Sequence, residues 1–161
     1  MKQFILLVLI LFTVDASSQD KRKNSVAENY KTSKFDVAIF PRTYIDLIPG
    51  KRFTPTKLQI DDAETNLTDQ IKNLNRALIN QTSGPIIHKR LRNYKRQYFG
   101  YTNEQGERIL LINCFWTKKK DKLKNWLDHR ISVLDGGSYY WEVKYNIEKK
   151  KIFDLDINGH G

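Results

Sequence analysis

The chain of 161 residues carries 28 lysines and arginines against 18 aspartates and glutamates, a formal net charge of +10 at pH 7. That length suits one domain with its own core, and the positive charge predicts attraction to anionic surfaces such as acidic glycans, lipid head groups or nucleic acid. A single cysteine, Cys114, excludes an internal disulfide, so we expect the hydrophobic core alone to hold the domain together.

The first residues have the pattern of an export signal. Lys2 is followed by a mostly apolar run at residues 4–14, which has the length of a signal-peptide core and is short for a membrane span. Small residues before Gln19 predict cleavage after Ser18, with cleavage after Ala16 as the alternative. We therefore predict a signal peptide at residues 1–18 and a periplasmic or secreted protein, with no transmembrane segment in its mature part.

The next segment, residues 19–34, is polar and charged, and we expect a flexible leader there. A short extended segment at residues 35–40 then ends at Pro41, because a proline favours an extended conformation in the residue before it.

The clearest predicted element is a helix from about residue 56 to residue 80. Thr56 and Gln59 fit a capping box, in which each side chain satisfies a backbone N–H of the other residue. Apolar residues recur every three or four positions and form one stripe that we expect to pack on a sheet. They are Ile60, Ala63, Leu67, Ile71, Leu74 and Leu78.

The second half of the chain predicts strands. Residues 94–102 and 108–116 flank a turn-forming sequence whose Gly106 can take the positive φ of a hairpin. Residues 117–129 are a charged connection, and strand-like residues resume at 130–134.

After a turn at residues 135–137, residues 138–146 and 151–158 alternate between apolar and polar residues and predict a second hairpin. Phe153, Leu155 and Ile157 are expected on one face of the last strand, with Asp154, Asp156 and Asn158 on the other.

These elements predict an α+β fold, in which one long amphipathic helix packs on a four- to five-stranded antiparallel meander sheet. We expect residues 35–161 to form this single domain.

A family resemblance adds to this interpretation. Residues 135–159 resemble the C-terminal hairpin of small uncharacterised exported proteins from Bacteroidota-type bacteria, and the resemblance covers residues 53–159. Similar features there are a Phe-Thr-Pro-Thr segment, an Ala-Glu pair, a Tyr-Phe-Gly-Tyr tract and an Ile-Asn-Cys strand, here at residues 53–56, 63–64, 98–101 and 112–114. The order of helix and strands is also similar to cystatin-like folds, which host inhibitors, binding modules and a few enzymes.

The sequence shows no catalytic, cofactor-binding or metal-binding motif. Cys114 lies in an apolar strand, where a free cysteine is typically a packing residue, and His88, His129 and His160 lack the spacing of metal ligands. An alternative, a small hydrolase or isomerase with a pocket between helix and sheet, requires titratable residues to converge in that pocket. The candidates are Asp135, Asp154, Asp156, His88 and His129.

Two basic segments interleave cations with aromatic residues, a pattern that suits polyanion binding. The possible anion-binding residues are Lys89, Arg90, Arg92, Lys95 and Arg96 in the first segment and Lys118, Lys119, Lys120, Lys122 and Lys124 in the second. Polyanion binding requires the two segments to form one patch. A lysine-rich solvated surface is the alternative interpretation.

The leading functional hypothesis is an exported, non-enzymatic binding or interaction module that recognises an unknown protein, peptide or glycan. The alternatives are a basic binder of polyanions, either acidic glycan or envelope phosphate, and the small hydrolase or isomerase. We expect no cofactor and no nucleic-acid partner, because an exported protein rarely meets nucleic acid.

Overall fold

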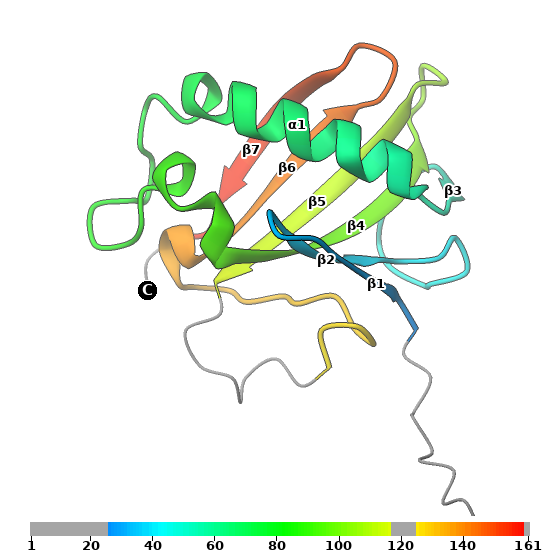
Figure 1. Cartoon of the computed structure of the whole chain (residues 1–161), viewed down its shortest axis with the longest axis horizontal. Helices are drawn as coiled ribbons and strands as arrows, with labels where there is room; N and C mark the ends of the chain where they lie inside the picture. Colours follow the sequence, from blue (N-terminus) through cyan, green and yellow to red (C-terminus); the bar gives the residue numbers. More distant parts are fainter. Residues whose placement is uncertain (1–25, 117–124, 160–161) are drawn as a thin grey trace, which may run out of the picture.

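The computed structural model describes residues 26–116 and 125–159, which form one helix packed on a mixed sheet of seven strands (Figure 1). The elements are β1 (Glu28–Lys31), β2 (Asp36–Ile39), β3 (Lys51–Phe53), α1 (Lys57–Leu74), the 3-10 helices η1 (Ile87–Lys89) and η2 (Leu91–Asn93), β4 (Tyr94–Thr102), β5 (Arg108–Trp116), the 3-10 helix η4 (Gly137–Tyr139), β6 (Tyr140–Asn146) and β7 (Lys151–Ile157). No helix of the described residues is long and apolar enough to cross a membrane. The predicted signal peptide at residues 1–18 lies outside the described residues.

The sheet corrects the predicted fold. Its order is β1-β2-β4-β5-β6-β7, and β3 pairs with the other end of β4. β2 pairs with β4 in parallel, whereas the other strand pairs are antiparallel. The predicted sheet, a four- to five-stranded antiparallel meander, is therefore wrong. The physical reason is that the connection between β2 and β4 contains α1, and such a crossover allows two strands to run parallel.

Strand β1 was not predicted, because residues 28–31 lie within the segment that was expected to be a flexible leader. Their side chains are mostly exposed, so they give no period-2 pattern of apolar residues. The strand forms because β2 offers it an antiparallel partner, with Glu28 opposite Ile39.

Helix α1 begins as predicted. The Thr56 hydroxyl accepts a hydrogen bond from the Gln59 N–H at 3.3 Å, and the Gln59 side chain accepts one from the Thr56 N–H at 2.9 Å. The helix ends at Leu74 rather than near residue 80, because the Asn75 side chain turns inward and exchanges two hydrogen bonds with the buried Gln81 amide, at 3.0 and 2.6 Å. Leu78 follows with a positive φ of 50°.

The sheet has a hydrophobic core on each face. The first core lies under α1 and contains Ile60, Ala63, Leu67 and Ile71 of the predicted stripe, together with Tyr98, Ile112, Trp141 and Val143. Leu74 and Leu78, which were expected in the same stripe, are exposed because the helix ends at Leu74. On the opposite face, Phe99, Phe115 and other residues are covered by irregular segments around residues 40–48 and 126–131.

The segment 130–134 is not a strand, contrary to prediction. Two buried amides of the sheet hold it instead: Gln97 accepts a hydrogen bond from the Ile131 N–H at 2.8 Å, and Asn113 donates one to the Ile131 carbonyl at 2.7 Å. The Gln97 amide also donates to the carbonyls of Trp126 and His129.

The two predicted hairpins form, and the first has the predicted bounds, with Gly106 at φ 81° in its turn. In the second, a bulge between Glu142 and Lys144 places Asp154 at φ 54°. Phe153 therefore packs on the core opposite α1, whereas Leu155 and Ile157 pack on the core beneath α1. The prediction that these three side chains share one face is wrong, because the bulge shifts the alternation by one residue.

Candidate functional site

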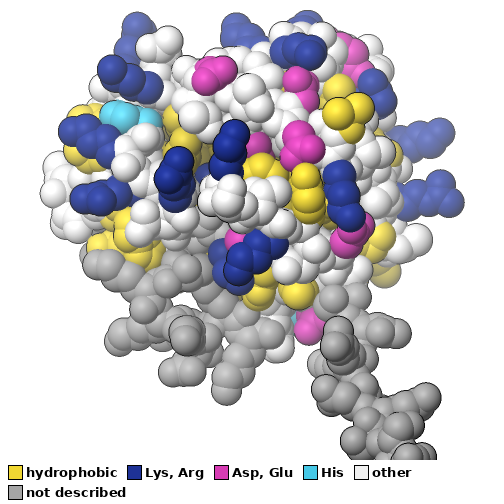
Figure 2. Space-filling model, in the orientation of Figure 1, with side chains coloured by type: hydrophobic (Ala, Val, Ile, Leu, Met, Phe, Trp, Pro, Cys, Tyr) yellow, Lys and Arg dark blue, Asp and Glu magenta, His cyan; other side chains and the backbone are white. Residues whose placement is uncertain are grey.

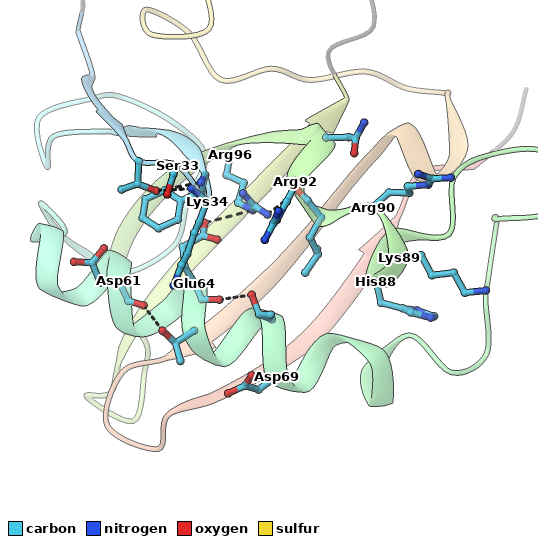
Figure 3. A pocket seen from close by; sticks show the side chains of 16 residues that line it. Ser33, Lys34, Asp61, Glu64, Asp69, His88, Lys89, Arg90, Arg92 and Arg96 are labelled. Carbon is cyan, nitrogen blue, oxygen red and sulfur yellow. Dashed lines mark hydrogen bonds and ion pairs between the residues drawn. The ribbon is translucent and has the colours of Figure 1, made fainter.

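A cleft of about 970 Å³ opens on the α1 side of the sheet (Figure 3). Its walls come from three places: the first part of α1, the turn between β1 and β2 at residues 32–35, and the segment that contains η1 and η2. The start of β4 contributes Arg96 to the lining.

Cations gather on the walls that face α1. Lys34 comes from the turn between β1 and β2, while Lys89, Arg90 and Arg92 come from the η1–η2 segment. All four side chains are exposed, and among the described residues none of them lies within ion-pair distance of a carboxylate. Figure 2 shows lysine and arginine side chains spread around a hollow on this face of the molecule. These cations are therefore available to a ligand.

The η1–η2 segment is anchored to the domain from below. The buried Gln81 side chain accepts a hydrogen bond from the Ile87 N–H at 2.9 Å, and Ile87 is completely buried in the core. The Arg96 guanidinium donates to the Leu91 carbonyl at 2.9 Å. The backbone of the segment is therefore fixed, and this reduces the conformational entropy that is lost when a ligand orders the cationic side chains.

Beneath the cleft lies a buried ion pair. The side chains of Arg96 and Glu64 are only 2% and 9% exposed, with Arg96 Nε 3.4 Å from Glu64 Oε1. The Tyr98 hydroxyl donates to the same Glu64 oxygen at 2.7 Å. Burial alone would lower the pKa of Arg96, but the Glu64 carboxylate, together with smaller contributions from Cys114 and Tyr98, raises it. Arg96 is therefore charged and already paired.

His88 lies on the same wall as the cations. Its Nδ1 is 3.1 Å from the Asn75 side-chain nitrogen, and because that nitrogen can only donate, Nδ1 accepts the hydrogen bond. Partial burial, followed by the positive charges of Lys89 and Lys72, lowers the pKa of His88 below 6.5. His88 is therefore neutral at pH 7 and adds no charge to the cleft.

The wall formed by α1 carries the opposite charge. Asp61 and Asp69 line it, and the Asp61 carboxylate accepts a hydrogen bond from the Tyr30 hydroxyl at 2.9 Å. The cleft thus has a cationic side and a carboxylate side (Figure 3). This polarity favours a ligand whose anionic groups face the turn at 32–35 and the η1–η2 segment.

A second, smaller hollow of about 450 Å³ lies beside the first and shares the turn at residues 32–35 with it. Its cations include Lys31 and Lys95, which share one carboxylate, that of Asp36, at 3.8 and 3.2 Å. The Lys95 ammonium also lies 4.0 Å from the centre of the Trp126 ring. The cationic surface thus continues past the turn.

The structure places the predicted anion-binding residues in three settings. Lys89, Arg90 and Arg92 lie on the cleft wall, and Lys95 lies in the second hollow. Arg96 is buried in its ion pair with Glu64, so it is not a free cation. The second predicted segment, with Lys118, Lys119, Lys120, Lys122 and Lys124, lies outside the described residues.

Sequence reasoning missed Lys34, because residues 19–34 were assigned to the leader. No local signal identifies it. Lys34 joins the site only because β2 pairs in parallel with β4, with Val37 opposite Arg96, which brings the turn before β2 next to the η2 segment before β4.

The residues of the enzymatic hypothesis do not meet. Of the five candidates, His88 lines the cleft, whereas Asp135, Asp154, Asp156 and His129 line neither hollow. Cys114 is fully buried, as expected of a packing residue, and burial raises the pKa of its thiol well above the ordinary value. Among the described residues, no group of three or more histidine, cysteine or acidic side chains is placed to hold a metal ion.

Comparison of the chain with protein-family models, curated proteins and solved structures found no match. The resemblance to small exported proteins of Bacteroidota-type bacteria therefore stays a prediction.

Proposed function

We propose that this protein is a non-enzymatic binding module that captures an anionic ligand in the cleft beside α1. The observation that carries the proposal is the convergence of four exposed cations on one side of a cleft of about 970 Å³. They are Lys34, Lys89, Arg90 and Arg92, and none of them has a carboxylate partner within residues 26–116 and 125–159. The ligand class is a polymer that bears carboxylate or phosphate groups, such as an acidic glycan or envelope phosphate.

The arrangement favours a chain of charges over a single small anion. The four cations lie along the cleft wall from the turn at 32–35 to η1 (Figure 3), and the second hollow extends the surface past the turn with Lys31 and Lys95. A polymer can engage several such charges at once, and each contact adds to the affinity through the release of counterions. Two arginines are present, and their planar guanidinium groups suit two-point contact with a carboxylate or phosphate.

Three titratable residues of the cleft, Glu64, His88 and Asp61, have structural partners, and this supports binding over turnover. An enzyme of the predicted hydrolase or isomerase kind would need a nucleophile or a base within reach of an acid in the same pocket. Here Glu64 is committed to Arg96 and Tyr98, and His88 is committed to Asn75. Asp61 is hydrogen-bonded to Tyr30. Each of these groups thus already has a structural partner.

The test is binding of purified protein to polygalacturonate across a salt series, with inorganic polyphosphate as the second probe. The variant Arg90→Gln/Arg92→Gln removes two cleft cations, and the control Lys149→Gln/Lys151→Gln removes the same charge from the β6–β7 hairpin. We expect the cleft variant to weaken binding and to reduce the slope of log affinity against log salt by about 1 to 2. The control should change both quantities much less.

The probe that binds more tightly identifies the ligand class, carboxylate polymer or phosphate polymer. Equal losses for the two variants would mean that net charge alone drives binding, and this would refute a role for the cleft. Absence of binding to both probes at low salt would refute the proposal as a whole.

A further inference from the structure

In the loop between β2 and β3, residues 41–50, two aliphatic side chains face outward and the aspartate between them faces inward. Ile45 and Leu47 are 94% and 99% exposed. Asp46, between them, has a side chain only 13% exposed. This is the reverse of the usual distribution, in which a loop points its charged side chains at water and buries its aliphatic ones.

Three inward contacts fix that orientation. The Tyr44 hydroxyl accepts a hydrogen bond from the Arg130 N–H at 3.0 Å, and Asp46 accepts one from the Arg130 guanidinium at 3.3 Å. Ile48 is buried in the core on the face opposite α1. Residues 44, 46 and 48 are thus held inward, and Ile45 and Leu47, which lie between them in the chain, face away from the protein.

The surroundings of the loop add positive charge and a further aliphatic residue. Arg42 and Lys51, at the two ends of the loop, are both exposed, and no carboxylate of the described residues pairs with either of them. The Arg42 N–H donates to the Thr54 hydroxyl at 2.9 Å, which holds the loop beside the start of α1. Leu58, in the first turn of α1 at the same end of the molecule (Figure 1), is 79% exposed.

We propose that this end of the molecule docks on an anionic phospholipid bilayer. Ile45 and Leu47 enter the boundary between head groups and acyl chains, and Arg42 and Lys51 contact the lipid phosphates. Both contributions are those by which peripheral proteins bind membranes: buried apolar area and attraction to anionic lipid.

The exposed fractions favour a membrane over a protein partner. Side chains that are 94% and 99% exposed contact almost nothing in their own protein, so they project singly instead of forming a packed patch. A specific protein interface needs a complementary surface of roughly 1,200–2,000 Å². A fluid layer of acyl chains, by contrast, closes around individual side chains without any preformed shape.

The test is sedimentation with vesicles of equal parts phosphatidylglycerol and phosphatidylcholine. We expect wild-type protein to bind, and the variant Ile45→Ser/Leu47→Ser to bind at least about tenfold more weakly, since each aliphatic side chain loses its transfer from water to the apolar layer. The matched control is Leu134→Ser, whose side chain is also 94% exposed but lies in a different loop. It should bind within about twofold of wild type.

Two further measurements separate this proposal from lipid binding by the cleft and from unfolding. In protein that carries Arg90→Gln/Arg92→Gln, adding Ile45→Ser/Leu47→Ser should still weaken vesicle binding about tenfold. A fluorophore on Leu47→Cys should shift to the blue on vesicle binding, and the buried Cys114 thiol should not compete for the label. The proposal is overturned if wild-type protein does not bind the vesicles, if the folded loop variant binds like wild type, or if the fluorophore of bound protein shows no shift.

Discussion

The buried ion pair between Glu64 and Arg96 allows a quantitative test of what stabilises the floor of the cleft. In the variant Glu64→Leu, Arg96 would stay buried with its charge unpaired, and the Tyr98 hydroxyl would lose the acceptor that it now has at 2.7 Å. The remaining hydrogen bonds of Arg96, to the Leu91 carbonyl at 2.9 Å and the Tyr94 carbonyl at 3.5 Å, supply only carbonyl dipoles to offset a full charge. We expect the free energy of unfolding to fall by about 3–5 kcal/mol, the usual cost of removing one partner of a buried pair.

The matched variant removes the charges together. Glu64→Leu/Arg96→Met/Tyr98→Phe replaces the ion pair and the dependent hydroxyl with apolar groups of similar size, so no buried charge remains uncompensated. We expect it to be more stable than Glu64→Leu alone by about 2 kcal/mol or more. If Glu64→Leu does not fold while the triple variant does, the same conclusion follows.

The assay is urea unfolding followed by circular dichroism, with the slope of free energy against urea compared among variants. Two outcomes would show that the buried charge does not set the stability of this site. One is a loss below about 1 kcal/mol for Glu64→Leu, which would mean that water reaches the pair. The other is a triple variant no more stable than the single variant, which would mean that packing and not charge sets the cost.

Three substitutions and one labelling experiment test separate parts of the structure. Thr56→Ala should lower the free energy of unfolding by about 1 kcal/mol through loss of the helix cap, and no loss would mean that the capping box contributes nothing. Asn113→Leu should lower the free energy of unfolding by about 1–3 kcal/mol, because the Ile131 carbonyl loses its donor. A loss below about 1 kcal/mol in urea unfolding would contradict this. The Tyr145 hydroxyl, followed by Lys150, lowers the pKa of Asp62 below 3.8. The stabilisation that ionised Asp62 contributes is therefore complete above that value and is lost as pH falls through the lower folded pKa. Asp62→Asn should reduce the decline of the melting temperature between pH 6 and about pH 2.5, and an unchanged decline would contradict this. Cys114 should react with a thiol reagent only as fast as the protein unfolds, whereas rapid reaction of native protein would show that the core opens locally.

The elements that the sequence predicted correctly are those whose signals are local. The start of α1 depends on Thr56 and Gln59, three residues apart, and the β4–β5 hairpin depends on a short turn that ends in Gly106. In both cases the residues that determine the element are also the residues that form it.

The features that the sequence did not predict depend on contacts between distant segments. β1 and β3 are short, and β2 pairs in parallel with β4 only after the chain has crossed over through α1. The bulge beside Asp154 also leaves no trace in the alternation of apolar and polar residues. These features require the whole sheet to be assembled before they can be identified.

The candidate site was likewise predicted only in part from the sequence. The run of cations at residues 89–96 is visible in the sequence, but its members have different fates: Arg90 is exposed on the cleft wall, whereas Arg96 is buried against Glu64. Lys34 completes the cationic side from a segment that the sequence assigns to a leader. Composition can thus show that the chain is basic, while the strand order decides which cations face a common ligand.

Binding of an anionic polymer in the cleft beside α1 can be observed residue by residue in a nuclear magnetic resonance titration of the isotope-labelled protein with oligogalacturonate. We expect the backbone amide signals of residues 32–35 and 88–93 to shift together with one affinity, and Arg90→Gln/Arg92→Gln to suppress those shifts. Shifts confined to the β6–β7 hairpin or scattered over all exposed lysines, with residues 88–93 unaffected, would contradict it.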